Sequence, residues 1–331
     1  MVDREHRIQQ FLARHGWDRA ARGVLAGDAS FRRYDRLVAN DGRRAVLMDA
    51  PPPQEDVRPF VTIENHLVDL GYSAPRLLAA DVESGLLLLE DLGDDTFTRL
   101  LATGNSEEDL YRLAVDQLVD LHRKGKAAIP AGLPPYDDQR LLTEALLLTD
   151  WYAKEMSPLP TGARDDYIGL WQALFPVARA VPESLVLRDF HVDNLLRLDG
   201  RPGVAACGLL DFQDAVVGPI TYDLMSLLED ARRDIDPALV AALRAYYLAA
   251  FPDLDAEAFN ASWAVLAAQR HAKVIGIFTR LCRRDGKPQY LPHIPRLWRL
   301  LENALTHPHL AALKDWMDRQ IPKDKRGVPQ P

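Results

Sequence analysis

The sequence predicts an α+β protein with two lobes: an N-terminal lobe of mainly antiparallel strands plus a helix, and a mainly helical C-terminal lobe that carries a small hairpin. In the first third of the chain, short apolar runs alternate with turns rich in Gly, Asn and Asp, as strands do. Further on, apolar residues recur at helical spacing. Two short apolar runs within residues 185–210 interrupt that helical pattern. A chain of 331 residues suffices for two lobes with separate cores.

The N-terminal lobe is predicted to span residues 1–92. It begins with a helix over 4–15, where apolar residues form a narrow stripe among charges. Four consecutive leucines at 86–89 are typical of a buried strand, and we expect them to lead into a hinge at 89–93. The other predicted elements are two strands joined around Gly27–Ser30, a strand at 45–48 and a helix over 57–70.

The C-terminal lobe is predicted to span residues 94–321. Ser106 followed by three acidic residues is typical of a helix start, because carboxylates favour the first turn of a helix. The final residues, 322–331, are rich in Lys and Pro, and we expect a disordered tail there. The predicted helices cover about 106–122, 138–155, 162–180, 222–229, 236–250, 255–282, 294–305 and 308–319.

Composition narrows the class of protein. The chain is 47% hydrophobic and 27% charged, as in ordinary globular proteins, and its net charge of −8 argues against a nucleic-acid partner held through phosphates. The two cysteines, Cys207 and Cys282, give no disulfide framework and fit a reducing cytosol. The charged N-terminus has no signal-peptide pattern, and no apolar run is long enough to span a membrane. We therefore expect a cytoplasmic monomer with no membrane partner.

The most informative stretch carries Asp189 and Asn194 in a polar loop, followed by Asp211 at the end of an apolar run. Two short strands joined by a turn would bring these three side chains around one small volume. An Asp can accept a proton from a substrate hydroxyl, whereas amide and carboxylate oxygens are ligands that suit Mg²⁺. The alternative is that these residues only cap turns.

The spacing of these residues matches a known catalytic arrangement. Asp189 and Asn194 have the D-x-x-x-x-N spacing of the protein-kinase catalytic loop, and Asp211-Phe212 stands where that family has D-F-G. A strand-rich lobe, a hinge and a helical lobe with a small hairpin form the layout of a two-lobed kinase. We expect a nucleotide to bind between the lobes.

On these residues the chain, over about 20–305, resembles the aminoglycoside phosphotransferase family of small-molecule kinases. The resemblance implies a bilobal, protein-kinase-like fold with ATP and Mg²⁺ as cofactors. It implies Asp189 as the catalytic base, Asn194 and Asp211 as magnesium ligands, and Asp223 as a brace for the catalytic loop. The chain has Leu187 where the family motif H-x-D-x-H-x-x-N begins with His.

A second departure concerns the phosphates. Where the family has a Lys on its third strand, this chain has Met48, which supplies no charge. Arg32 is the replacement that we favour; Arg33, Arg43 and Arg44 are alternatives, and all of these arginines could instead form a solvated strand face. No Walker A motif occurs. The residues expected near the nucleotide are Ser30, Phe31, Arg32, Arg33, Met48, Glu64, Glu90 and Leu92.

Several longer strings, among them 27–34, 47–52, 211–219 and 269–281, are together similar to the bacterial cell-wall amino-sugar kinases. That resemblance implies phosphorylation of the anomeric hydroxyl of N-acetylmuramate or N-acetylglucosamine in peptidoglycan recycling. A small-molecule sugar is thus the expected substrate. The residues expected to contact it are His191, Asp193, Trp151, Asp230, Arg232 and Arg270.

Alternatives remain open for the sugar site and for the activity. Trp151 could be a packing residue, and Arg270 with Lys273 could form structural ion pairs instead of binding an anionic substrate. A related kinase acting on an aminoglycoside, choline or homoserine is the second reading. A nucleotide-binding protein without catalysis is the third, because Met48 replaces the expected Lys.

Overall fold

The computed structural model describes residues 4–27 and 31–330. The chain forms two compact units, and each is discontinuous in sequence: the first comprises Met1–Gln117 with Val192–Ala215, and the second comprises Leu118–His191 with Val216–Pro331. The predicted lobes, 1–92 and 94–321, were continuous. Their assignment to nucleotide and substrate roles stays a prediction. None of the helices in the described ranges has the length and apolar character needed to cross a bilayer.

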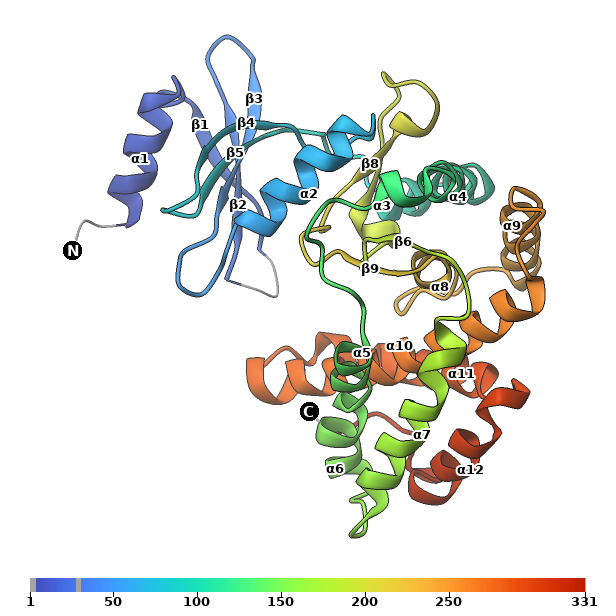
Figure 1. Ribbon diagram of the computed structural model, residues 1–331. Helices are drawn as coiled ribbons and strands as arrows, with labels where there is room; N and C mark the ends of the chain where they lie inside the picture. The colour runs from blue at the N-terminus through green and yellow to red at the C-terminus, as the bar shows by residue number, and fades with distance from the viewer. Residues whose placement is uncertain (1–3, 28–30, 331) are drawn as a thin grey trace. The chain divides into compact units, whose positions relative to one another are not determined.

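The first unit is built on one antiparallel sheet with the strand order β1-β2-β3-β5-β4 (Figure 1). Short, half-buried strands alternate inward and outward side chains, which is why turn-bounded runs of this kind pair into a sheet. The sequence predicted four of the strands but not β4. The bounds are β1 (Ala21–Gly27), β2 (Arg33–Val38), β3 (Arg44–Asp49), β4 (Leu77–Asp81) and β5 (Leu86–Glu90).

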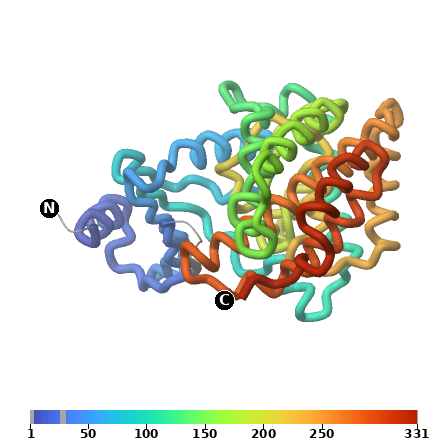
Figure 2. The backbone as a smooth tube through the Cα atoms, turned by 90° about the horizontal axis from the view of Figure 1, so that it is seen from below, coloured from blue at the N-terminus to red at the C-terminus, as the bar shows by residue number. Residues whose placement is uncertain are grey.

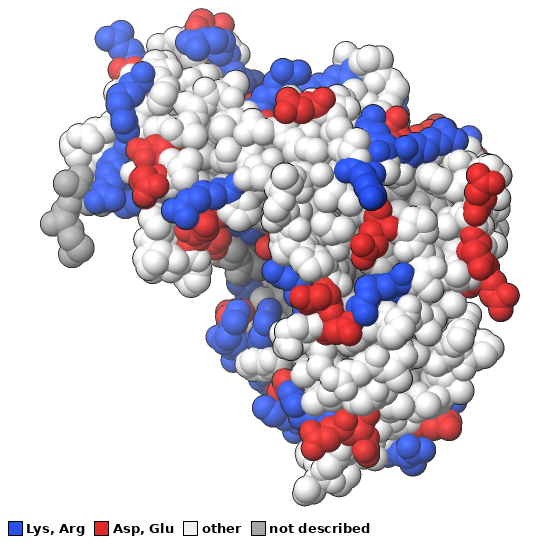
Figure 3. All heavy atoms as spheres, viewed as in Figure 1, with Lys and Arg blue, Asp and Glu red and all other residues white. Residues whose placement is uncertain are grey.

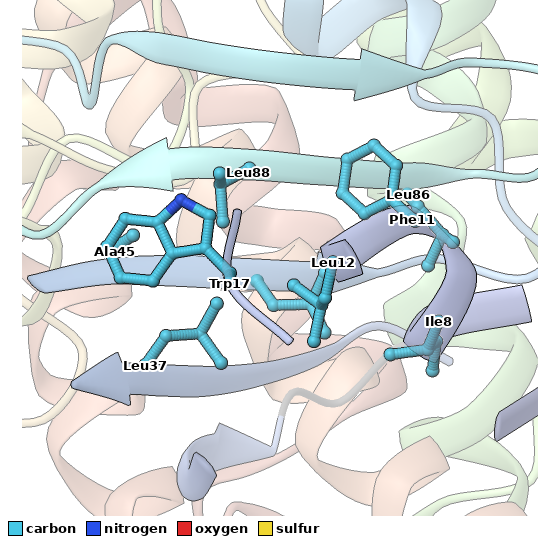
Figure 4. Close-up of a cluster of buried hydrophobic side chains, with 9 residues drawn as sticks. Ile8, Phe11, Leu12, Trp17, Leu37, Ala45, Leu86 and Leu88 are labelled. Carbon is cyan, nitrogen blue, oxygen red and sulfur yellow. The ribbon is translucent and has the colours of Figure 1, made fainter. Parts of the chain in front are cut away.

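Helix α1 (Arg4–Arg14) covers one face of this sheet, and Figure 4 shows its side chains in contact with those of the strands. The buried residues of this cluster are Ile8, Phe11, Leu12, Trp17, Leu37, Ala45, Leu47, Leu86 and Leu88. Because side chains alternate along a strand, Tyr34, Val46 and Met48 belong to the opposite face. That opposite face is therefore free of α1 and is available for a ligand.

The remaining elements of the first unit place the polar loops. Helix α2 (Arg58–Asp69) buries Phe60, whose ring stacks on Phe212 with 4.9 Å between centroids. Strands β7 (Leu195–Arg197) and β8 (Cys207–Leu209) form the expected small hairpin. A six-residue helix, α3 (Phe97–Ala102), was not predicted from the sequence.

The second unit is mainly helical and is built around the 30-residue helix α10. Strand β6 (Glu183–Val186) pairs with β9 (Val216–Pro219), so the polar loop after β6 is anchored in this unit. Helices α7 and α12 lie side by side in Figures 1 and 2, and the Trp316 indole donates to the Ala163 carbonyl at 3.0 Å. The bounds are α5 (Asp138–Ala145), α6 (Lys154–Met156), α7 (Ala163–Ala178), α8 (Thr221–Leu228), α9 (Pro237–Ala249), α10 (Ala256–Asp285), α11 (Ile294–Ala304) and α12 (Ala311–Gln320); α4 (Glu107–Arg123) starts in the first unit.

Two predictions for the helical part need correction. The helix predicted over 138–155 is interrupted, because a π-helical turn at Leu148–Ala153 separates α5 from α6. The tail predicted to be disordered is ordered to residue 330: the Arg326 guanidinium is buried and pairs with Glu302 and Asp318, at 2.6 Å each. One buried cation with two carboxylate partners is enough to tie a polar segment down.

Charges on the surface are largely paired. Arg283 with Glu155, at 2.6 Å, is one of many ion pairs between arginine and a nearby carboxylate. Figure 3 shows Lys and Arg mixed with Asp and Glu over the face in view.

Candidate active site

The first unit contains a cavity of about 450 Å³, within the size range of small-molecule sites. It opens on the sheet face opposite α1, since Tyr34 and Val46 line it. The full lining is Leu25, Tyr34, Val46, Phe60, Pro75, Leu89, Glu90, Asp91, Leu92, Gly93, Asp94, Thr96, Asp193, Asn194, Leu196, Leu210 and Asp211. Apolar side chains from the sheet and the hairpin thus enclose one part, and oxygen-bearing side chains the other.

The predicted hinge lies on this cavity. Glu90 and Leu92 both line it, as does the backbone of Gly93. Glu90 is held in place by an ion pair with Arg201 of the hairpin. The apolar walls with nearby backbone polar groups suit a flat aromatic base, which buries apolar faces and presents polar edges.

The two predicted magnesium ligands meet at the polar part of the cavity. The Asn194 side-chain amide lies 3.4 Å from Asp211 Oδ2. Gln213 donates to Asp211 Oδ1 at 2.7 Å. Asp211 has φ of 57°, a left-handed conformation that Asp tolerates better than most residues, and this turn aims its carboxylate back toward the hairpin.

This donor set fits Mg²⁺. The ion prefers hard oxygen ligands, and one amide with one carboxylate leaves positions for water and phosphate oxygens. Asn194 and Asp211 would hold it. Asp193, next in the chain, accepts a hydrogen bond from Thr98 and lines the same cavity. Asp193 belongs to the first unit, and its expected contact with the sugar stays a prediction.

Arg32 is the cation that comes to this polar end. Its Nη1 lies 3.9 Å from Asp211 Oδ1 and its Nε lies 3.6 Å from Glu55 Oε2, with only 12% of the side chain exposed. Arg33 is turned to the opposite face of the sheet, where it pairs with Asp35 at 3.0 Å. Arg44 pairs with Asp91 at 2.9 Å. Of the candidate replacements for a strand lysine, Arg32 is the one placed beside the metal ligands.

The other residues expected at the nucleotide differ in burial. Met48 is buried on the cavity's sheet face but does not line the cavity. Glu64 is buried; its Oε1 accepts from the Leu77 N–H at 3.2 Å, and in the part of the chain that the structure describes its Oε2 has no hydrogen-bond partner. Burial raises the pKa of Glu64. Phe31 is exposed, and Ser30 lies outside the described residues.

In the second unit, the loop after β6 carries Asp189. The Asp223 carboxylate on α8 accepts the Leu187 N–H at 2.6 Å and the Arg188 N–H at 2.9 Å. On the other side of the turn, Arg270 Nη1 donates to the Arg188 carbonyl at 3.2 Å. Burial raises the pKa of Asp223 to about 7, although the two N–H groups favour its charged form. Asp223 thus occupies the place of a loop brace.

The electrostatic surroundings of Asp189 keep it ionised. Burial alone would raise the pKa of its carboxyl, but the positive charges of Lys273 and Arg270 on α10 outweigh burial and leave that pKa below its usual value. A carboxylate that stays charged at neutral pH and is held on an anchored loop has the properties of a general base.

Sequence reasoning missed Glu144, on α5, which lies at the centre of this region. Its carboxylate accepts hydrogen bonds from Tyr136, Arg188, Gln269 and Lys273, and the pKa of Glu144 is lowered to about 2: burial opposes the shift, and the charges of Lys273 and Arg188 outweigh it. Lys273 therefore forms a structural ion pair with Glu144, which is one of the two alternatives that the sequence left open for it. Arg270 is likewise engaged with the loop backbone.

Most of the residues expected at the sugar lie in this second unit. His191 is buried, and Arg232 Nη1 lies 3.5 Å from its Nε2. Burial and Arg232 lower the pKa of His191, which favours the neutral ring. Asp230 accepts from the Arg232 N–H at 2.7 Å, and its Oδ2 is buried without a partner among the described residues. Trp151 is half-buried and lines a separate hollow with Lys154 and Glu155.

The α+β fold, with an antiparallel sheet in one unit and mainly helices in the other, is that of small-molecule kinases. The chain belongs to the phosphotransferase enzyme family, whose sequence profile it matches over residues 23–259.

The chain is 36% identical to the N-acetylmuramate/N-acetylglucosamine kinase of Caulobacter vibrioides, with 98% of each chain covered. It is 39% identical to the N-acetylmuramate/N-acetylglucosamine kinase of Pseudomonas aeruginosa, over 92% of this chain and 91% of the relative.

Solved structures share the fold. A choline/ethanolamine kinase family protein from Mesorhizobium loti superposes with a TM-score of 0.63 at 14% identity, covering 95% of this chain and 100% of the other. The GDP complex of aminoglycoside 2′-phosphotransferase-IIIa superposes with a TM-score of 0.61 at 16% identity, covering 92% and 99%. The predicted protein-kinase-like fold and the predicted family are thus confirmed.

Proposed function

We propose that this protein transfers the γ-phosphate of ATP to the anomeric hydroxyl of N-acetylmuramate, N-acetylglucosamine or both, in the recycling of cell-wall sugars. The observation that carries the proposal is the near full-length likeness, at 36% and 39% identity, to two kinases named for these sugars. The likeness to the choline/ethanolamine kinase family protein and to the aminoglycoside 2′-phosphotransferase, at 14% and 16% identity, extends to the fold alone.

The cavity of the first unit suits the nucleotide. In the proposal, Leu25, Val46 and Leu89 enclose the base beside the hinge residues Glu90 and Leu92. Mg²⁺ held by Asn194 and Asp211 would neutralise charge on the transferring phosphoryl group. Arg32 supplies a second positive charge beside Asp211, in place of the strand lysine that the family has at the position of Met48.

Asp189 acts as the base in this proposal. It accepts the proton of the sugar hydroxyl as that oxygen attacks the γ-phosphorus, and the bond from phosphorus to the departing ADP oxygen breaks. Four residues lie between Asp189 and Asn194, so their Cα atoms are at most about 18 Å apart even in a fully extended chain.

The sugar contacts are proposed on the second unit. Asp230 has a buried carboxylate oxygen available to a hydroxyl or amide N–H of the substrate, and Arg232 supplies a positive charge beside His191. A carboxylate such as the lactyl group of N-acetylmuramate would pair with Arg232. Arg270 supports the loop backbone, so its role in binding is indirect.

Phosphate transfer from ATP to N-acetylmuramate, N-acetylglucosamine, kanamycin and choline tests the proposal, with Mg²⁺ and with EDTA. We expect magnesium-dependent ADP release with the two sugars and a product that mild acid hydrolyses, because sugar 1-phosphates are acid-labile. Turnover confined to kanamycin or choline would favour the second reading. ATP binding without turnover on any acceptor would favour a non-catalytic protein.

A further inference from the structure

Arg188, directly before the proposed base, has a backbone conformation that is unfavourable for its residue type. Its φ is 68°, in the left-handed region that residues with a Cβ atom rarely adopt. Glycine would adopt this conformation without strain. Such a conformation persists only where the surrounding structure holds it, and it occurs preferentially at functional sites.

The peptide groups around Arg188 are held from both sides. Asp223 accepts the N–H groups of Leu187 and Arg188. Arg270 donates to the Arg188 carbonyl and also contacts the Tyr222 hydroxyl, at 3.2 Å each. These contacts fix the peptide planes, yet any residue at position 188 would receive them, so they do not explain why an arginine is there.

The Arg188 side chain has its own anchor. Its Nη2 donates to Glu144 Oε1, and its guanidinium lies 5.6 Å from the Tyr136 ring. Glu144 also receives Lys273 Nζ at 2.9 Å and Gln269 Nε2 at 3.2 Å. Only 17% of the Arg188 side chain and 12% of the Glu144 side chain are exposed. A buried carboxylate with four donors is a rigid anchor, because each bond restricts the others.

This anchor connects two helices with the residue before the base. Glu144 lies on α5, Lys273 and Gln269 lie on α10, and Arg188 lies on the loop after β6. The side chain at position 187 is an apolar Leu with 3% of its surface exposed, so it forms no hydrogen bond that could hold the loop. The charged anchor of the turn therefore comes through Arg188.

We propose that Glu144 is a positioning residue for phosphoryl transfer: by holding the Arg188 guanidinium it keeps the left-handed turn in the conformation that presents Asp189 to the acceptor hydroxyl. The inference rests on the proposed function, because it assigns Asp189 as the base. Glu144 does not line the cavity of the first unit, and in this proposal it acts through Arg188. Displacing a catalytic group by about 1 Å can cost on the order of 100-fold in rate.

The competing explanation is that the Glu144 cluster only stabilises the fold. The two explanations differ in kinetics. Loss of a purely structural ion pair lowers the melting temperature and leaves kcat of the folded enzyme unchanged. Loss of a positioning residue lowers kcat even at temperatures where the variant is fully folded. The KM for ATP should move little in either case, because the nucleotide cavity belongs to the first unit.

The test compares Glu144→Gln, Arg188→Met and the double variant with the wild-type enzyme on whichever acceptor the wild type phosphorylates. Glu302→Gln is the matched control, since Glu302 pairs with the buried Arg326 in the same unit at 2.6 Å and lies outside the site. We expect each single variant to lose about 10- to 100-fold in kcat with KM for ATP within about twofold. We expect the double variant to be no worse than the poorer single, because both changes remove one interaction. The control should retain full kcat.

Arg188→Gly separates the side-chain anchor from backbone strain. Glycine accepts φ of 68° but removes the guanidinium, so the inference expects a loss as large as that of Arg188→Met. Wild-type kcat in Arg188→Gly or Glu144→Gln, or additive losses in the double variant, would overturn the inference. Should Glu144→Gln fail to fold, Arg188→Lys, which keeps the charge and shortens the reach, carries the same comparison.

The same assay distinguishes the inference from the function on which it rests. A wild-type enzyme that phosphorylates neither sugar refutes the proposed substrates. A wild-type enzyme that is active while Glu144→Gln is equally active refutes the positioning role alone.

Discussion

Replacing Arg32 tests how this chain binds phosphate without a strand lysine. In Arg32→Ala, a phosphate bound next to Asp211 loses a guanidinium that would lie about 5 Å away. Two unit charges at that distance interact by about 3 kcal/mol at an effective dielectric of about 20. The Arg32 side chain is 12% exposed, so solvent screens this interaction only in part. We expect kcat/KM for ATP to fall by about 30- to 150-fold, which corresponds to about 2–3 kcal/mol.

The adjacent arginine is the control for this prediction. Arg33 has 52% of its side chain exposed and pairs with Asp35 on the other face of the sheet. We expect Arg33→Ala to stay within about twofold of the wild type, as for most surface substitutions. Initial rates at varied ATP, with melting temperatures as a check on folding, give both values. Equal effects of the two substitutions would refute the assignment of Arg32 to the phosphates.

Three further predictions concern the second unit. Asp189→Asn should lower kcat by about 10²- to 10⁴-fold with little change in ATP binding, as measured by rapid-quench kinetics and calorimetry. Lys273→Met removes the positive charge that most strongly opposes the effect of burial on Asp189, so the pKa of the Asp189 carboxyl should rise. The acidic limb of the pH profile of kcat/KM should then move to higher pH, independently of any fall in the maximal value of kcat/KM. The other titratable groups around Asp189 keep their identity in this variant: Arg188, His191, Asp223 and Arg270. Gly276→Ala would put a Cβ 2.2 Å from the Leu147 carbonyl carbon, so we expect a loss of about 1–3 kcal/mol and a fall of about 2–12 °C in Tm by scanning calorimetry; an unchanged Tm would contradict the close packing of α10.

The elements that the sequence predicted are those with a strong local pattern. The leucines of β5 and the acidic first turn of α4 were identified because a few neighbouring residues specify them. Strand β4 was missed because two of its five residues are Ala and none is β-branched. Helix α3 has six residues, too few for a helical period to be recognised, although Thr96 caps it by accepting the Arg99 N–H.

Long-range pairing could not be read from the chain. The hairpin of β7 and β8 is local and was predicted, but the pairing of β6 with β9 joins segments about 30 residues apart and has no signature of its own. The β6–β9 pair is what anchors the start of the Asp189 loop. The order of the polar residues along the chain therefore indicated the chemistry of the loop, whereas its support became visible only in three dimensions.

The same distinction holds within the site. Asp189 and Asn194 were predicted from their D-x-x-x-x-N spacing within six residues, and Asp211 from its place at the end of the next apolar run. Glu144 precedes Arg188 by 44 residues, and nothing in α5 alone distinguishes it from a solvated carboxylate. One signal was available: an arginine in a loop next to a base needs a carboxylate partner if it is buried, and a search for acidic residues among otherwise apolar helix positions would have included Glu144.

Met48 stands where the family has a strand lysine, and Glu64 is buried with no hydrogen bond to its Oε2 among the described residues. Met48 packs between Tyr34 and Leu87 in the sheet register, and a lysine there would be a buried charge that needs a carboxylate. Glu64, which we expected near the nucleotide, accepts the Leu77 N–H, and burial raises its pKa, so its carboxyl group is more readily neutralised than a paired carboxylate would be. Arg32, directly before β2, brings a positive charge beside Asp211, one of the two proposed metal ligands, so Met48 by itself gives no reason to infer an inactive enzyme.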